Sequence, residues 1–385
     1  MHMHSAAHPL GWAARPARRT GRNTSTAPLP WPRIVGIGGG TGLPVVLRGL
    51  SEALREASQQ AAVAATPDHL VAIVTVTDDG GSSGVLRRQL GVLPPGDVRN
   101  CLAALADGPS PFVEMLQHRF NGATPFVGHT VGNLMLAALT QMSGNFAVAV
   151  EQLSEVLAVR GRVYPSTLEN VSLTAEFCDG HIARGETAIV RRHAPIKHLW
   201  LERQVQPLPD ALRALVNAEV IVVGPGSLYT SVLPNLLVGG IASTISGVKA
   251  VRIYVANLMT EPGETDGFSI DDHLRVIREH VGYDLFDYVL VNDRAMDDQL
   301  VAHYAERGSV PVPDGGRYQA AGPAQIVRRP LAAELWGDKI RHAPAALART
   351  ILELAEAGRT GDTPSAGAGS AARPSPGTPS PPVIP

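Results

Sequence analysis

The sequence predicts an α/β fold: a Rossmann-like, mainly parallel sheet with helices on both faces. Short runs rich in β-branched residues alternate along the chain with amphipathic segments. The apolar residues of these short runs are nearly continuous, which is typical of strands buried on both faces. Buried strands that alternate with helices favour a parallel sheet over an antiparallel one.

The apolar pattern gives each element an expected place. The expected strands are residues 33–37, 70–76, 220–223, 250–255 and 288–291. The amphipathic segments between them predict helices over residues 43–58, 98–105, 131–142, 146–159, 269–281 and 298–306. Residues 171–190 differ, because short runs of alternating polarity indicate a small antiparallel excursion there.

Composition divides the 385 residues into three parts. Residues 1–32 are rich in Ala, Arg, Pro and Thr without a usable period. We expect a disordered basic leader there, which is favoured over an organelle transit peptide. Residues 33–357 are expected to form the folded domain. Residues 358–385 are a Pro/Ser/Gly/Ala tail that cannot bury enough apolar surface to offset its ordering entropy, and its Ser and Thr side chains are candidate phosphorylation sites.

Composition also narrows the class of protein. Hydrophobic residues make up 44% of the chain, which is enough for a sizeable core, and the formal net charge of -2 gives no electrostatic argument for a nucleic-acid partner. Two cysteines, Cys101 and Cys178, argue against a disulfide-rich secreted domain. Because no run reaches the ~20 apolar residues of a membrane helix, we expect a cytoplasmic protein without a membrane span.

A dense glycine turn follows the first strand and leads directly into a helix. It comprises Gly38, Gly39, Gly40, Thr41 and Gly42. Glycine lets the backbone approach a ligand closely, and successive N–H groups at a helix start attract a phosphate or pyrophosphate. The turn lacks the Gly-Lys-Ser/Thr ending of a Walker A loop. We expect phosphate binding here rather than a purely structural turn.

Carboxylates and hydroxyls follow the second strand. The segment reads Asp78, Asp79, Gly80, Gly81, Ser82 and Ser83. Carboxylates accept hydrogen bonds from sugar hydroxyls, and adjacent aspartates can coordinate Mg²⁺. Capping of the next helix by either aspartate is the structural alternative. The sequence favours a ligand role for the segment and leaves Mg²⁺ binding by Asp78 and Asp79 as an open alternative.

Two later helix starts also carry polar residues. Asp97 is expected to be a helix N-cap, and Asn100 in the first turn faces either solvent or a phosphate. Asn133 opens an apolar helix, where an amide suits an anion or a sugar. For the neighbouring His129, a structural hydrogen bond is favoured over acid–base catalysis.

A second glycine turn follows the strand at 220–223 and again leads into a helix. Its candidate ligand-binding residues are Gly224, Gly226, Ser227, Tyr229 and Thr230. Two such turns on neighbouring strands would flank a single crevice. Asn257 follows another strand and is a candidate for the same ligand. Glu261 and Glu264, a few residues later, are expected to be solvated loop acids rather than bases.

Taken together, these motifs resemble the YvcK-type gluconeogenesis-factor family, within the broader CofD-like superfamily. The resemblance spans residues 33–357. The segments that carry it are GIGGGTGLPVVLRGL, TVTDDGGSSGVLRRQLGVLPPGDVRNCLAALA, GHTVGNLMLAAL, GPGSLYTSVLPNLLV and YVANLMTEPGETDGFS.

The resemblance implies a Rossmann-like cytoplasmic protein that binds UDP-sugars, notably UDP-N-acetylglucosamine. It implies roles in cell shape, envelope synthesis and growth on gluconeogenic carbon sources, with protein partners in peptidoglycan synthesis; a homo-oligomer remains open. The resemblance also assigns ligand binding to Tyr304 and Arg341. A tyrosine ring can stack on uracil, and a guanidinium can form bidentate bonds to a diphosphate.

The enzyme branch of the superfamily transfers a phospholactyl group with a guanine nucleotide and Mg²⁺. Where that branch has a Ser-Pro-Asp type segment, this chain reads PPGDVR from Pro94 to Arg99, and Arg99 brings positive charge. The first hypothesis is therefore a non-catalytic UDP-sugar-binding regulator, and the alternative is a Mg²⁺-dependent transferase acting on a nucleotide-activated phosphorylated substrate. A nicotinamide-dependent dehydrogenase is a third and less favoured reading, because the second strand lacks the usual ribose clamp.

Overall fold

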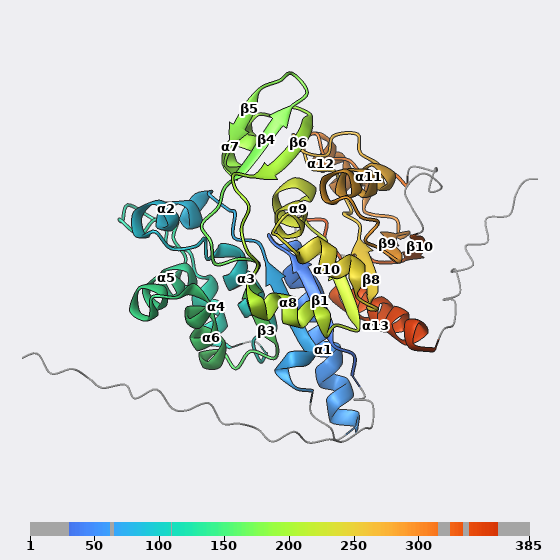
Figure 1. Ribbon diagram of the computed structural model, residues 1–385, viewed down its shortest axis with the longest axis horizontal. Coiled ribbons are helices and arrows are strands. Elements are labelled where there is room, and N and C mark those ends of the chain that lie inside the picture. The colour runs from blue at the N-terminus through green and yellow to red at the C-terminus, as the bar shows by residue number, and fades with distance from the viewer. Residues whose placement is uncertain (1–30, 62–64, 109, 315–323, 334–338, 361–385) are drawn as a thin grey trace, which may run out of the picture. The chain divides into compact units, whose positions relative to one another are not determined.

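Figure 1 shows the computed structural model, in which residues 31–61, 65–108, 110–314, 324–333 and 339–360 are described. A seven-stranded sheet in these residues has the order β10-β9-β8-β7-β1-β2-β3, and its paired strands are all parallel. The strands are β1 (Ile34–Gly38), β2 (Leu70–Val74), β3 (Arg162–Pro165), β7 (Val220–Val223), β8 (Val251–Val255), β9 (Tyr288–Asn292) and β10 (Gln325–Arg329). The expected parallel α/β fold is confirmed.

Five of these strands lie where the sequence places them, and two were missed. The missed strands, β3 and β10, are the two edges of the sheet. Only every second residue of β3 is buried, and β10 has a single buried valine. A strand with one neighbour needs no continuous apolar run, so the pattern used for the central strands does not detect it.

Helices connect the strands and cover both faces. They are α1 (Gly42–Ala61), η1 (Pro67–His69), α2 (Gly81–Leu90), α3 (Gly96–Leu105), α4 (Pro111–Gln117), α5 (Val131–Ser143), α6 (Phe146–Val156), α8 (Pro209–Val216), the π-helical turn η2 (Leu228–Val232), α9 (Leu233–Leu236), α10 (Ile241–Gly247), α11 (Ile270–Val281), α12 (Asp298–Ala305) and α13 (Pro344–Thr360). The expected helices are all present, with ends shifted by a few residues.

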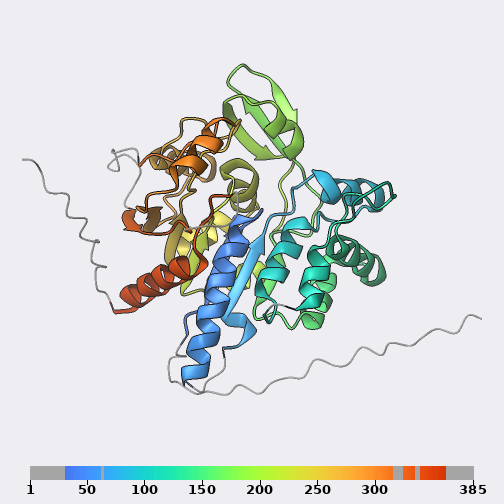
Figure 2. The same cartoon turned by 180° about the vertical axis from the view of Figure 1, so that it is seen from behind.

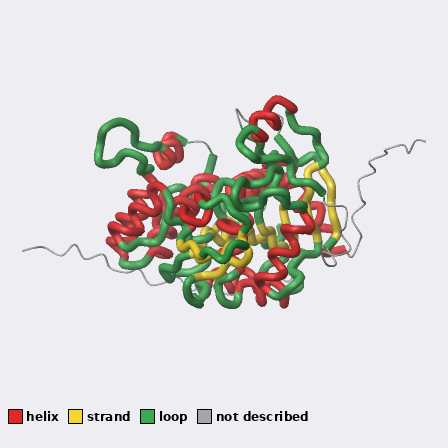
Figure 3. Tube along the Cα trace, turned by 90° about the horizontal axis from the view of Figure 1, so that it is seen from above, coloured by secondary structure: helices red, strands yellow, loops and turns green. Residues whose placement is uncertain are grey.

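Alternate residues of each strand enter two separate cores. Ile34 of β1 packs in the core under α1, α3 and α13, whereas its neighbour Val35 packs in the core under α8, α10 and α11. Helices α1 and α13 lie side by side on their face of the sheet (Figure 2). Figure 3 shows the strands enclosed by helices and loops. Burial on both faces explains the continuous apolar runs of the central strands.

The antiparallel excursion expected over 171–190 is a separate three-stranded sheet. It contains β4 (Leu173–Phe177), β5 (Ile182–Arg184) and β6 (Ile196–Leu201) in the order β5-β4-β6, with α7 (Glu186–Arg191) beside them. Its third strand lies outside the expected range. The small sheet contacts α11, because the Leu199 N–H donates to His280 Nε2 at 3.0 Å and the His198 and His280 rings stack at 4.8 Å.

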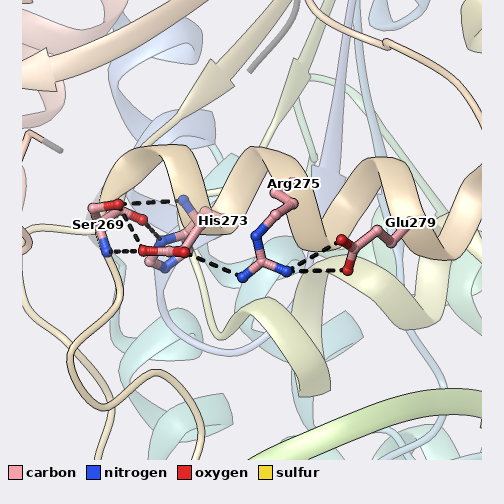
Figure 4. Close-up of polar contacts among 5 residues, drawn as sticks. Ser269, His273, Arg275 and Glu279 are labelled. Atoms are coloured by element: carbon pink, nitrogen blue, oxygen red, sulfur yellow. Dashed lines mark hydrogen bonds and ion pairs between the residues drawn. The ribbon is translucent and has the colours of Figure 1, made fainter. Parts of the chain in front are cut away.

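Helix α11 begins with a reciprocal cap (Figure 4). The Asp272 N–H donates to Ser269 Oγ, and Asp272 Oδ2 accepts from the Ser269 N–H at 2.9 Å. Further along, Arg275 donates to both Asp272 and Glu279. The two bonds between Ser269 and Asp272 satisfy backbone N–H groups that a helix N-terminus otherwise leaves free, so the start of α11 is well defined.

The expected tails lie mostly outside the described residues, at 1–30 and 361–385. Helix α13 runs to Thr360, three residues beyond the expected boundary of the folded domain. Within the described ranges, no single helix has the length and apolar composition to cross a membrane; one bent pair, Leu228–Leu236 with Ile241–Gly247, meets the criteria jointly at an angle of 73°.

Gly49 lets α1 approach α13, and its substitution tests this packing. A Cβ at Gly49 would lie 2.1 Å from the carbonyl oxygen of Pro344. We expect Gly49→Ala to lower the free energy of unfolding by about 2 kcal/mol, since overpacking costs roughly 1–3 kcal/mol. Urea denaturation measures this loss.

Gly247→Ala is the matched control, because Gly247 ends α10 and a Cβ there would have no neighbouring atom within 4 Å. This control should be neutral or stabilising by up to about 1 kcal/mol. Equal effects of the two substitutions would show that the contact between α1 and α13 is looser than described.

Candidate functional site

The sheet changes direction beside its central strand. From β1 the chain adds β2 and then β3 on one side, and later adds β7, β8, β9 and β10 on the other. The connections after β1 and β7 therefore lead to helices on opposite faces of the sheet, which makes this a topological switch point. In open α/β sheets, ligands bind at such a point, beyond the carboxyl ends of the strands.

The two glycine turns meet at this point. A Cβ on Gly42 would lie 2.1 Å from the carbonyl oxygen of Pro225, so only glycine permits the observed contact. Asn235, buried on α9, holds the turns in place by donating to Gly38 O at 3.0 Å and to Ser231 O at 2.8 Å. The expected convergence of the two turns on one crevice is what the backbone shows.

A pocket of about 620 Å³ opens over these turns. This volume lies within the usual range for small-molecule sites. Its walls come from the β1 turn, the β7 turn, the loop after β8, the end of α12 and the segment before α13. The lining residues are Gly40, Thr41, Gly42, Val45, Pro225, Gly226, Ser227, Ser231, Asn257, Leu258, Met259, Thr260, Glu261, Pro262, Tyr304, Arg307, Ser309, Ile340, Arg341 and His342.

Distant parts of the chain deliver Tyr304 and Arg341 to this pocket. Arg341 Nη1 donates to Thr41 Oγ1 at 3.1 Å, and the hydroxyl of Tyr304 accepts from the Ile340 N–H at 3.2 Å. The segment after α12 is itself held against the β8 loop, because the Thr260 N–H donates to Val310 O at 2.7 Å. Both residues named by the family resemblance therefore line the same pocket as the first glycine turn, and Arg341 contacts that turn directly.

Asn257 braces the second glycine turn. Its Oδ1 accepts from the Gly226 N–H and its Nδ2 donates to Gly226 O, both at 2.9 Å. Ser227 Oγ accepts from the Thr230 N–H at 3.2 Å and caps the helical turn that follows. Tyr229 does not face the pocket: it is 1% exposed, packs in the core and meets the rings of Phe268 and His280 edge-on.

Asp97 is not the N-cap of α3 that the sequence suggested. Pro95 occupies the cap position, and Asp97 Oδ2 instead accepts from the Gly40 N–H at 2.7 Å. Asn100 Nδ2 donates to Gly40 O at 3.3 Å. Burial, followed by the nearby charge of Asp78, raises the pKa of Asp97 to about 6. The start of α3 thus fixes the conformation of Gly40, which has a φ of +61°.

The segment after β2 lies outside the lining of the pocket, and its Asp78 is close enough to Asp97 to raise the pKa of that carboxyl. Asp78 Oδ1 accepts from the Gly80 N–H at 2.8 Å, and burial raises the pKa of Asp78. Asp79 Oδ1 accepts from the N–H and the hydroxyl of Thr187, at 2.8 and 2.7 Å. Because Thr187 belongs to α7, Asp79 ties the small antiparallel sheet to the main one.

Asp78, Asp79 and Asp97 do not form a complete set of protein ligands for a metal ion. In the described part of the chain, no three His, Cys, Asp or Glu side chains are grouped as metal ligands. Asp79 already accepts two hydrogen bonds from Thr187, and Asp97 accepts one from Gly40. Mg²⁺ binding by Asp78 and Asp79 stays a prediction, because Mg²⁺ is usually held by one or two carboxylates together with waters and substrate phosphates.

Ser82, His129 and Asn133 form a buried polar network. Ser82 Oγ lies 2.9 Å from His129 Nδ1 and accepts from Asn133 Nδ2 at 3.0 Å. Arg99 joins this network by donating to Thr130, Asn133 and Asn100, so it faces neither solvent nor the pocket. The network joins the first turns of α2, α3 and α5, and a structural role for His129 agrees with it. Ser83 Oγ similarly accepts from the Gly96 N–H at 3.2 Å.

Glu261 and Glu264 are not solvated loop acids. Glu264 is only 7% exposed and accepts a hydrogen bond from the hydroxyl of Ser227, and Glu261 lines the pocket with its Oε2 buried. Burial raises the pKa of both carboxyls. The expectation was wrong because the loop after β8 folds back under the β7 turn, a long-range contact that local composition does not encode.

Sequence reasoning also missed Ser231 and Arg307 in the pocket lining. Ser231 lies four residues after Ser227, so the spacing of one helical turn is a signal that was available. Arg307 follows α12 by two residues, and its place at the pocket depends on how that helix docks on the β8 loop.

Asp97 should make stability depend on pH. Its folded pKa of about 6 lies above the ordinary 3.8, so its stabilisation is full below about pH 4 and is lost as pH rises through about 6. Asp97→Asn keeps an acceptor for Gly40 and removes the titration. We expect the stability of this variant relative to wild type to rise by about 2 kcal/mol between pH 4 and 7, in denaturant melts.

The exposed Asp284→Asn is the control for that experiment and should show no such rise. If the difference in stability between Asp97→Asn and wild type stayed constant across this pH range, Asp97 would be ionised in the folded protein without loss of stability.

Comparison with known proteins gives one consistent family. The family model described as 2-phospho-L-lactate transferase CofD matches residues 34–330. A gluconeogenesis factor of Bacillus subtilis is 40% identical over 324 residues, which cover 84% of this chain and 98% of that protein. A gluconeogenesis factor of Halalkalibacterium halodurans is 41% identical over 322 residues, with 83% and 95% covered.

Solved structures agree with the sequence comparison. A crystal structure of a UPF0052-family protein from Bacillus halodurans has a TM-score of 0.75 and 41% identity to this chain. The match covers 83% of this chain and 99% of the solved one. The chain therefore belongs to the CofD family and, within it, to the gluconeogenesis factors.

Proposed function

We propose that this protein binds a nucleotide sugar, UDP-N-acetylglucosamine, at the pocket over the two glycine turns. The observation that carries the proposal is the meeting of the β1 turn with Tyr304 and Arg341 in one pocket of about 620 Å³. These groups lie about 260 and 300 residues apart along the chain, so their proximity is a product of the fold.

The chemistry of the pocket suits a diphosphate attached to a base and a sugar. Backbone N–H groups at the start of the 20-residue helix α1 attract anions, and the Arg341 guanidinium beside Thr41 adds a charge-assisted donor. The Tyr304 ring supplies a stacking surface for uracil. Asn257, Ser227 and Ser231 place amide and hydroxyl groups along the same wall, where sugar hydroxyls can bond.

Ligand binding would act as a switch rather than as the first step of a reaction. The pocket wall combines turns of the main sheet with the separate segment that carries Tyr304 and Arg341. A ligand that contacts both parts favours the arrangement in which the two parts lie together around it. A partner protein that recognises this arrangement then binds better. We propose a regulator of envelope synthesis in the cytoplasm, whose partners act in peptidoglycan synthesis and whose loss impairs cell shape and gluconeogenic growth.

Calorimetric titration with UDP-N-acetylglucosamine tests the binding. We expect saturable binding by wild type and at least a tenfold weaker affinity for Arg341→Ala, because a charge-assisted hydrogen bond contributes roughly 1.5–3 kcal/mol. Tyr304→Ala should weaken binding by a similar factor through loss of stacking.

Arg349→Ala is the matched control, because Arg349 is an exposed arginine of α13 outside the pocket lining. Its affinity should equal that of wild type. No heat at millimolar ligand with wild-type protein, or equal losses in Arg349→Ala and Arg341→Ala, would contradict the proposal.

A second candidate function is a transferase acting on a nucleotide-activated phosphorylated substrate. The match to the CofD transferase model and the carboxyl of Asp97 beside Gly40 favour it. Incubation with nucleotide-activated substrates, Mg²⁺ and candidate acceptors should then release a nucleotide, and Asp79→Asn should abolish that release. Binding without release of a nucleotide from any of these substrates would count against the transferase.

A further inference from the structure

Glu261 lines the proposed nucleotide-sugar pocket, and one of its carboxyl oxygens is buried without a partner in the described part of the chain. Glu261 belongs to the loop after β8, and its Oε2 is buried with no hydrogen-bond partner among the described residues. A carboxylate buried in this way would pay a large desolvation cost beside a site that attracts anions. The neutral acid avoids this cost and carries an unused donor, which can bond to an acceptor that arrives with the ligand.

The neighbouring carboxyl decides which of the two acids keeps a proton. Glu264 accepts from the hydroxyl of Ser227, and hydrogen bonds from the Tyr229 N–H and from Thr230 also lower its pKa. Two carboxyls that share one buried site do not both ionise readily. The negative charge therefore resides on Glu264, which has more donors, and the proton resides on Glu261.

We propose that Glu261 is a neutral acid in the ligand-free protein and donates a hydrogen bond from Oε2 to an acceptor oxygen of the bound ligand. This inference rests on the proposed UDP-sugar function and adds a specificity-determining residue to the same pocket. The acceptor is a ligand oxygen that has lone pairs but no proton, such as an oxygen of a diphosphate ester or of a pyrimidine carbonyl. A ligand with a hydroxyl at that place would bond less selectively, since a hydroxyl both donates and accepts.

Two titratable groups near Glu261, His342 and Tyr254, are neutral near pH 7. Burial lowers the pKa of His342 to about 4, so this imidazole is neutral, and burial raises the pKa of Tyr254, so this phenol keeps its proton. The titratable and charged groups that surround Glu261 in the pocket and in the loop beneath it are Tyr254, Glu264, Tyr304, Arg307, Arg341 and His342.

The affinity for the ligand should therefore depend on whether Glu261 carries its proton. Burial, and next the charge of Glu264, raises the pKa of Glu261 to about 8, and these two causes outweigh the lowering by the Ser227 hydroxyl. Above that pH the free protein must take up a proton before it binds, so affinity falls about tenfold for each further pH unit. Below it the donor is already in place and affinity is flat.

Titration of wild type and Glu261→Gln with UDP-N-acetylglucosamine from pH 6.5 to 9 tests the inference. Glutamine keeps a donor and cannot ionise. We expect the two proteins to bind within about threefold of each other at pH 7, and wild type to lose about tenfold by pH 9. Glu261→Gln should change less than about twofold over the same range, and the exposed control Glu306→Gln should follow wild type.

Parallel pH profiles for wild type and Glu261→Gln, or a loss of tenfold or more in Glu261→Gln at pH 7, would overturn the inference. A ligand-free measurement separates this outcome from failure of the UDP-sugar proposal. Since the folded pKa exceeds the ordinary 4.5, wild-type stability relative to Glu261→Gln should fall as pH rises from about 5 to 9. No binding by either protein would overturn the ligand proposal, whereas a flat stability difference would overturn the neutral acid.

Discussion

The contact between the two glycine turns is the constraint on which the site depends. Strands β1 and β7 are neighbours in the sheet, and their turns pass so closely that a methyl group on Gly42 would overlap the Pro225 carbonyl. Any side chain there would push the turns apart and separate the β1 amides from the wall formed by the β7 and β8 loops. The glycines therefore serve close approach of two backbone segments, and exposure of N–H groups to an anion follows from that approach.

A second group of polar contacts supports the turns from behind. Asp97 and Asn100 of α3 hold Gly40 from both its N–H and its carbonyl, while Asp79 binds Thr187 of α7. The acidic motif after β2 thus connects the main sheet to the small antiparallel sheet. The start of α3 in turn contacts the glycine turn. Asp79 makes the first of these contacts through Thr187, and Asp97 makes the second.

Much of the fold could be read from the sequence, because burial on both faces leaves continuous apolar runs and glycine-rich strand ends. The edge strands β3 and β10 could not be predicted in this way, since fewer of their residues are buried. The site residues also differ in how well local sequence predicts their positions. Tyr304 and Arg341 both line the pocket, although no local pattern places them there, and their ligand-binding role stays a prediction. Asp97 and Glu261 were misread because their surroundings come from remote segments, and composition near them resembles that of a helix cap and a solvated loop.

A crystal structure with UDP-N-acetylglucosamine tests most directly whether the two glycine turns form the ligand site. The predicted result places the diphosphate between the Gly40–Gly42 backbone and Arg341, with the uracil against Tyr304. Density for the ligand elsewhere, for instance in the separate groove of about 570 Å³ that Glu151 and Tyr164 help to line, would contradict it.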